Sequence, residues 1–227
     1  MTRTDVQVQD TLPEGTYAAR AVLDAGTLDT IREANAAYLG LVAGRHARAP
    51  GAPAFGLPGV LVARVAALDA TARDRAARCR YTLFNMRFED AQFWRSVVRD
   101  GPRTAPMGVS DDAPLVRTAL FFAWHLVQRG DLAAALALGM TPAVELAWLT
   151  LPLSTLERAA TVALPQLVAR WGGHPRFWPR LLDAATRGLE ERAAQVRLLG
   201  MQLLASDGYR AQLASPPLHE RSVPGEP

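Results

Sequence analysis

"FNMRFEDAQFW", residues 84–94, and "LVARWGGHPRFW", residues 167–178, decide the fold of this chain. Each stretch has an Arg beside an aromatic residue and, a few positions later, a Phe-Trp pair. Pairs of large aromatic residues are typical of side chains that fill the space between packed helices. Two copies of one pattern predict two copies of one structural unit.

The repeat extends beyond these stretches when the chain is compared with itself at a shift of 83 positions. Identical residues then coincide, and one inserted residue brings the two Phe-Trp pairs into line. The coinciding pairs are Gly56 with Gly139, Leu68 with Leu151, Arg75 with Arg158, Ala76 with Ala159, Ala77 with Ala160 and Arg87 with Arg170. Self-similarity at a fixed spacing predicts two related helical units.

Eight residues of the two quoted stretches are the predicted structural anchors of the repeat. Large aromatic side chains bury much apolar surface, so we expect each Phe-Trp pair to insert between helices of its own unit. Glu89 and Asp90 precede the first pair, where negative charge favours the N-terminus of a helix. The anchors are Arg87, Phe88, Phe93, Trp94, Arg170, Trp171, Phe177 and Trp178.

The pattern of apolar residues predicts an all-α protein. Between positions 28 and 42 apolar residues recur at helical spacing, with Asn35 as the exception, so one stripe of this helix faces a core. Thr27 is the predicted N-cap of this helix, and Gly44 is the predicted stop.

Further helices are expected at residues 59–68, 71–79 and 114–129, the last being the most apolar. Thr71 and Ser154 begin capping-box patterns, because an acidic residue follows each of them three positions later. These two positions coincide under the shift, which supports the repeat.

The predicted organisation is two helical units in tandem that share the apolar helix at residues 114–129. A flexible N-terminal arm and a disordered, Pro- and Ser-containing tail would flank them. The predicted segments are residues 1–26 for the arm, 27–129 for unit 1, 114–205 for unit 2 and 206–227 for the tail.

Composition excludes several classes of protein. The single Cys79 cannot form an internal disulfide, and with four His it makes no spacing typical of a metal site, so we expect no metal and no cofactor. No apolar run is long enough for a signal peptide or a membrane span, which favours a cytoplasmic protein without membrane contact. Nucleophile-elbow, P-loop and dinucleotide-binding patterns do not occur, so we expect no enzyme.

Positive charge is concentrated in one part of the chain. Residues 43–103 hold 11 Arg against 5 acids, a net of +6, whereas the whole chain is only +3. Such a cluster is either a positively charged surface that binds nucleic acid or the solvated face of an Arg-rich helix. The candidate DNA-binding residues are Arg73, Arg75, Arg78, Arg80, Arg95, Arg99 and Arg103.

Two tryptophans of the second half are candidates for a protein interface. Trp124 and Trp148 lie in apolar helical segments, and each is either a core residue or an interface hot spot. His125, next to Trp124, is interpreted as a core or interface residue rather than a metal ligand.

Several stretches resemble one known family, FlhD, which is a subunit of the bacterial flagellar master transcriptional activator. "IREANAAYLGL" at residues 31–41 resembles the family's first helix, and residues 54–90, which end in "RFED", resemble its middle section. "SDDAPLVRTALFFAWHLVQ" at residues 110–128 is similar to its closing helix, and residues 137–160 make a second, weaker match. The resemblance covers about residues 28–205, but the family is a single unit of about half this length, and Phe84 replaces a family cysteine.

The resemblance implies an all-α transcription regulator without enzymatic activity. FlhD proteins act as homodimers and bind DNA jointly with FlhC, a zinc-containing protein subunit. A tandem copy would therefore act through an FlhC-like partner, either by self-association or as an internal pseudo-dimer, and would activate flagellar, mobile-element or secretion genes. The alternative is a helical adaptor or scaffold, for example one associated with secretion, that does not bind DNA.

Overall fold

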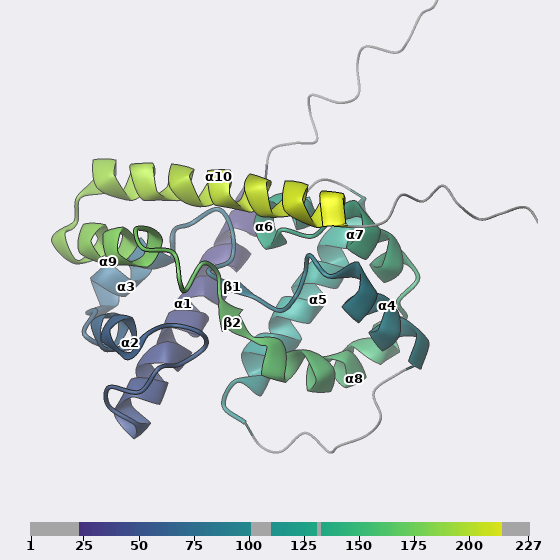
Figure 1. Cartoon of the computed structure of the whole chain (residues 1–227), viewed down its shortest axis with the longest axis horizontal. Coiled ribbons are helices and arrows are strands. Elements are labelled where there is room, and N and C mark those ends of the chain that lie inside the picture. The colour runs from purple at the N-terminus through teal and green to yellow at the C-terminus, as the bar shows by residue number, and fades with distance from the viewer. Residues whose placement is uncertain (1–22, 101–109, 131–132, 215–227) are drawn as a thin grey trace, which may run out of the picture.

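The computed structural model of the chain describes residues 23–100, 110–130 and 133–214 (Figure 1). Within these ranges nearly all regular structure is helical, which confirms the prediction of an all-α fold. The elements are α1 (Ala25–Arg48), α2 (Gly59–Ala66), α3 (Ala70–Ala77), β1 (Phe84–Asn85), α4 (Ala91–Asp100), α5 (Ala113–Arg129), α6 (Ala133–Leu138), α7 (Pro142–Leu149), α8 (Leu153–Ala163), the 3-10 helix η1 (Leu164–Gln166), β2 (Val168–Ala169), α9 (Phe177–Arg187) and α10 (Glu190–Ala214). Most of the predicted arm and part of the predicted tail lie outside the described residues.

The first helix is longer at both ends than predicted. Asp24 is its N-cap, because the backbone N–H of Thr27 donates to Asp24 Oδ1 at 2.7 Å, so the prediction of Thr27 as the cap is wrong. Gly44 lies inside the helix rather than at its end. The extra turn places Arg45 and Arg48 beside two acidic residues at the start of α5, with which both form ion pairs.

The predicted capping boxes do not form at the two equivalent helix starts. Asp69 caps α3, since its Oδ1 accepts from the backbone N–H of Ala72 at 2.6 Å, and Thr71 is already inside the helix. α8 begins directly after Pro152, which has no side-chain hydrogen bond to offer, and Ser154 lies in the first turn. Both helices therefore begin earlier than the pattern indicates.

α1 packs against α2, α3 and α5, and its buried stripe includes Ile31, Tyr38 and Leu39. Asn35 is the polar exception in that stripe, and it is fully buried. Its amide donates to the carbonyls of Ala77 and Tyr81, and its Oδ1 accepts from the backbone N–H of Leu83 at 2.7 Å. A buried amide costs free energy unless it is hydrogen-bonded, so this residue holds the segment after α3 against α1.

A short antiparallel strand pair joins the two halves of the chain near the middle of the molecule (Figure 1). Phe84 of β1 pairs with Ala169 of β2, and Asn85 pairs with Val168. From this crossing, α4 leaves the first half and packs on α7 and α8 of the second half. α9 leaves the second half and packs on α2 and α3 of the first half.

The reciprocal packing corrects one prediction about the anchors. Trp94 of α4 does not insert between helices of its own half but lies against Trp148 of α7, with ring centroids 4.7 Å apart. Phe177 of α9 lies against Tyr81, which follows α3 in the first half, with ring centroids 6.4 Å apart. The strand pair is the physical reason, because it directs each following helix across to the opposite half.

The same hydrogen bond fixes the tryptophan anchor in both halves. Trp94 Nε1 donates to the carbonyl of Arg87 at 2.9 Å, and Trp178 Nε1 donates to the carbonyl of Arg170 at 2.8 Å. Both indoles are fully buried, together with Phe88 and Phe177, whereas Phe93 and Trp171 are half-buried.

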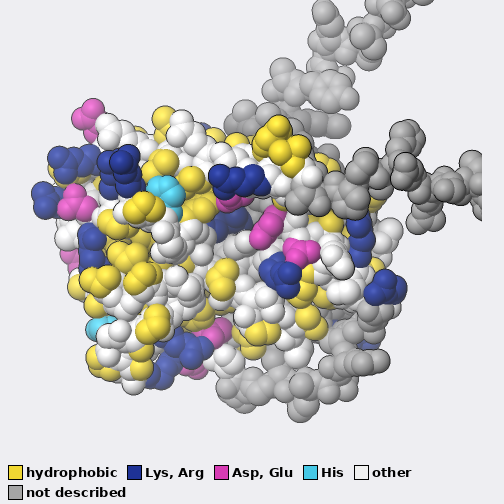
Figure 2. Space-filling view, viewed as in Figure 1, with side chains coloured by type: hydrophobic (Ala, Val, Ile, Leu, Met, Phe, Trp, Pro, Cys, Tyr) yellow, Lys and Arg dark blue, Asp and Glu magenta, His cyan; other side chains and the backbone are white. Residues whose placement is uncertain are grey.

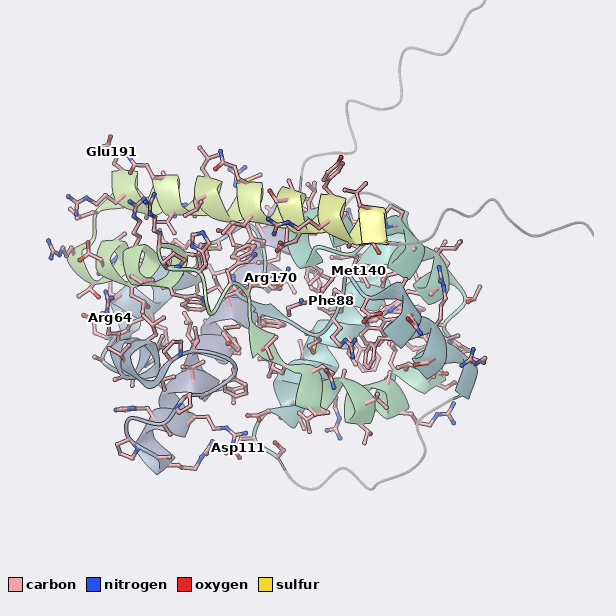
Figure 3. The ribbon with its side chains drawn as sticks, in the orientation of Figure 1. Arg64, Phe88, Asp111, Met140, Arg170 and Glu191 are labelled. Atoms are coloured by element: carbon pink, nitrogen blue, oxygen red, sulfur yellow. The ribbon has the colours of Figure 1, made fainter. Side chains whose placement is uncertain are left out.

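The two anchor arginines lie in opposite environments. Arg87 is exposed, pairs with Asp90 and stacks over the ring of Phe93. Arg170 is buried at the centre of the molecule (Figure 3), where it donates to the carbonyl of Leu138. Desolvation lowers the pKa of Arg170 to about 10, so its guanidinium stays charged at neutral pH.

α10 is the long helix that crosses one side of the molecule (Figure 1) and extends nine residues beyond Ala205, to Ala214. The predicted start of the disordered tail at residue 206 is therefore wrong. Asp207 accepts a hydrogen bond from Trp171 Nε1 at 2.7 Å, which ties this part of the helix to the loop after β2. No helix within the described ranges is long and apolar enough to cross a membrane.

Candidate nucleic-acid interface

The arginines predicted to contact DNA do not form one surface. α3 lies toward one end of the molecule beside α9, and α4 lies toward the other end beside α7 (Figure 1). The predicted set divides accordingly into Arg73, Arg75, Arg78 and Arg80 on α3 and the residues after it, and the exposed Arg95 and Arg99 on α4. Arg103 lies outside the described residues.

Two arginines of the α3 group make hydrogen bonds to backbone carbonyls. Arg75 Nε donates to the carbonyl of Ala185 at 2.7 Å, which joins α3 to the last turn of α9. Arg73 Nη2 lies 3.4 Å from the carbonyl of Leu68 and is half-buried. A charged donor on a helix-end carbonyl stabilises that helix, so Arg75 has a structural role that its position in a basic run does not reveal.

The other two arginines of the group are exposed. Arg78 Nη2 pairs with Asp74 Oδ2 at 2.8 Å, and Arg32 Nη2 lies 2.5 Å from the other oxygen of the same carboxylate. Desolvation acts to raise the pKa of Asp74, but the hydrogen bonds and charges of the two arginines outweigh it, so the pKa is lowered. Arg80 has no carboxylate partner within the described part of the chain.

The tertiary structure adds arginines of the second half to the α3 group. Residues 59–80 and 176–201, which form α2, α3, α9 and the first half of α10, together carry ten Arg against five acids. Figure 2 shows basic side chains gathered where α9 and the start of α10 lie. We call this surface the basic face, and its arginines are Arg64, Arg73, Arg75, Arg78, Arg80, Arg176, Arg180, Arg187, Arg192 and Arg197.

Net charge makes the basic face the strongest candidate for contact with a polyanion. Its excess of five positive charges exceeds the +3 of the whole chain, so the rest of the chain is net negative. Phosphate contacts made by Arg supply affinity and orientation without reading sequence. The five arginines of the second half were missed because a basic run is visible in a sequence, whereas residues more than 80 positions apart are not seen to meet.

The two candidate interface tryptophans lie in different environments. Trp148 is fully buried and packs against Trp94 and Phe88, so of its two predicted roles the structure supports the core. Trp124 is half-buried, and its Nε1 donates to the carbonyl of Leu151 at 3.0 Å.

Two single-residue predictions concern residue types that can bind a metal ion. Cys79 is buried as predicted, and desolvation raises the pKa of its thiol to about 12. His125 is exposed on α5 beside a shallow groove, so its core interpretation is wrong and an interface role stays a prediction. Within the described ranges no three His, Cys, Asp or Glu residues lie close enough to hold a metal ion.

Comparison of the chain with protein-family models, with curated proteins and with solved structures finds no match.

Proposed function

We propose that the chain is an FlhD-like subunit of a transcription activator, which binds DNA through the basic face together with an FlhC-like, zinc-containing partner. The DNA-binding part of this proposal rests on one observation. The two halves of the chain bring ten arginines and only five acids to the same four helices. The family assignment and the partner rest on the resemblance of residues 28–205 to FlhD.

We further propose that the tandem units form an internal pseudo-dimer that replaces the family's homodimer. α2 and α7 have the same length and begin 83 residues apart, and α3 and α8 also begin 83 residues apart. The strand pairing is reciprocal, and α4 and α9 are exchanged between the halves. Such exchange is the expected relation between two subunits joined about a two-fold axis.

Fluorescence anisotropy with labelled promoter DNA from the host tests the DNA-binding proposal. Replacing Arg73, Arg78 and Arg80 by Gln removes three charges but leaves the structural Arg75 in place. We expect weaker binding and a plot of log affinity against log salt that is less steep by about 3, one for each lost phosphate contact. A matched variant, Arg95→Gln, changes α4 and should leave the slope unchanged.

Unchanged affinity and slope in the triple variant would remove the α3 part of the basic face from the proposal. If Arg95→Gln alone lowers affinity, the α4 side is the DNA contact instead. The same titration with and without the purified FlhC-like protein of the host tests joint binding. The resemblance to FlhD implies that the mixture binds DNA more tightly than the chain alone.

Multi-angle light scattering of the whole chain tests the pseudo-dimer. In a pseudo-dimer, the strand pair and the exchanged helices both form within one chain. A second chain is therefore not needed for either feature. An obligate dimer formed through β1, β2, α4 and α9 would contradict it. Cross-linking at these elements distinguishes that dimer from one formed through another surface.

A helical adaptor that does not bind DNA is the second candidate function, and one surface favours it. α10 exposes large apolar side chains along its length, with Leu198 58% exposed, Met201 43%, Tyr209 64% and Leu213 69%. Exposed apolar stripes of this kind mark protein interfaces. If Leu198→Glu with Met201→Glu abolishes partner binding while the triple arginine variant changes nothing, the adaptor function is favoured over the regulator.

A further inference from the structure

A groove of about 550 Å³ lies within the basic face, between α2, α9 and α10. Its size falls in the range of small-molecule sites, roughly 300–1,000 Å³. Arg64 of α2 lies at one side of it (Figure 3), and Arg180 and Arg192 line it from α9 and α10. The three positive side chains thus come from three helices that the fold brings together.

The charge of the groove is not cancelled by its own carboxylate. Asp183 lines the groove, but its Oδ1 pairs with Arg187 Nε at 2.9 Å and its Oδ2 lies 3.5 Å from Arg192 Nη1. Arg180 is exposed and has no carboxylate partner within the described ranges. Arg64 Nη2 donates to the carbonyl of Pro179 at 3.2 Å, which holds the guanidinium at the groove. Among the described residues, this guanidinium has no carboxylate partner.

The groove also has an apolar side, which a phosphate group alone would leave uncovered. Pro179, Val196 and Leu199 line it from α9 and α10, with Val196 almost fully buried. The exposed Gln195 offers an amide that both donates and accepts hydrogen bonds. The lining therefore suits a ligand with an anionic end, an apolar planar body and polar edges.

We infer that this groove is a binding site for a mononucleotide, whose phosphate lies among Arg64, Arg180 and Arg192 and whose base covers Pro179 and Leu199. Guanidinium groups bind phosphate oxygens through paired N–H donors, and three of them around one groove discriminate strongly against neutral ligands. Gln195 is placed to bond the edge of the base. The inference does not depend on DNA binding, because the groove is complete within the chain.

Isothermal titration calorimetry of the whole chain, without DNA, is the direct test. The probes are AMP, GMP, CMP and UMP at an ionic strength of about 0.15 M, where exposed charges are screened. Inorganic phosphate and the matching nucleosides are titrated separately, because each represents one part of a nucleotide. We expect at least one nucleotide to bind about tenfold or more tightly than either of its halves.

Two groove variants and one matched control locate the site. Arg180→Gln removes the exposed charge and should weaken nucleotide binding about tenfold, the loss expected for one charge-assisted hydrogen bond. Gln195→Trp fills the groove without changing a charge and should also weaken binding. Arg158→Gln removes an exposed arginine of α8, away from the groove, and should leave binding unchanged. Circular dichroism confirms that each variant is folded.

Any one of three results would overturn the inference: that none of the four nucleotides binds, that phosphate binds as tightly as the nucleotides, or that Arg158→Gln weakens nucleotide binding as much as Arg180→Gln does. In a parallel DNA titration, Arg180→Gln and Gln195→Trp could both weaken DNA binding while no nucleotide binds. The groove would then hold a backbone phosphate of DNA, so the inference would fail while the proposed function would stand.

Discussion

Replacing Trp94 and Trp148 by Phe, one at a time, tests how the exchanged helix α4 is held against α7. The two indoles are fully buried, and their rings are in edge-to-face contact with centroids 4.7 Å apart. They differ in hydrogen bonding. Trp94 Nε1 donates to the carbonyl of Arg87, whereas Trp148 Nε1 is buried without a partner among the described residues.

The two variants should differ in free energy of unfolding because the two indole N–H groups differ in hydrogen bonding. Trp→Phe removes the same atoms from the same cluster, so the loss of packing is similar at both positions. Trp94→Phe also loses a hydrogen bond, which contributes about 1 kcal/mol to the free energy of unfolding. Trp148→Phe instead removes an unsatisfied N–H, whose burial costs about 1–3 kcal/mol. We expect Trp94→Phe to be the less stable variant by about 2–4 kcal/mol, the sum of these two effects.

Urea unfolding followed by circular dichroism at a helix wavelength measures both free energies without relying on tryptophan fluorescence. The comparison requires equal slopes of free energy against urea concentration, since a changed slope indicates a changed unfolded or native state. Equal stability of the two variants, within the error of the measurement, would refute the reasoning. A less stable Trp148→Phe variant would show that its indole has a partner in solution.

Three further predictions concern backbone conformation, the end of α10 and pH. Gly139→Ala should lower the free energy of unfolding by more than the roughly 1–2 kcal/mol expected of Gly188→Ala, as measured by urea unfolding. Both glycines have positive φ, but at Gly139 a Cβ would lie 2.8 Å from a side-chain carbon. Asp207→Ala should speed amide hydrogen exchange at the C-terminal end of α10, because it removes a hydrogen bond to an indole, and the start of α10 should be unaffected. The hydrogen bond from the backbone N–H of Thr27 lowers the pKa of Asp24 to about 2. The ionised carboxylate should therefore stabilise the fold above about pH 4, and this stabilisation should be lost as the pH falls toward 2. The melting temperature of Asp24→Asn should depend less on pH in that window.

The helical content could be predicted because it depends on local pattern. Helical spacing of apolar residues indicates which stretches form helices and which side faces the core. The aromatic anchors were predicted as buried because few other environments accommodate a Phe-Trp pair. Four of the six are fully buried, whereas Phe93 and Trp171 are half-buried. Helix ends were less predictable, since Asp24 and Asp69 took capping positions that the pattern assigned to Thr27 and Thr71.

The candidate site was only partly visible in the sequence. The run from Arg73 to Arg80 stands out because four arginines lie within eight residues. Whether each guanidinium is free to bind a ligand depends on what packs against it. Arg75 reaches the carbonyl of Ala185, a residue 110 positions away. Arg180 and Arg192, in contrast, lie in an almost neutral part of the chain and became candidates through their position beside Arg64.

Sequence alone determined that this protein is helical and that the tryptophans of its two Phe-Trp pairs are buried, because both follow from local pattern. Comparison of the chain with itself showed that its two halves share a pattern. Only the tertiary structure decided that α4 and α9 are exchanged between the halves, because the exchange accompanies the pairing of two short strands that begin 84 residues apart. That crossing brings α9 and α10 beside α2 and α3, and so assembles the basic face and its groove. Long-range pairing depends on the geometry of the whole chain, which no local pattern contains.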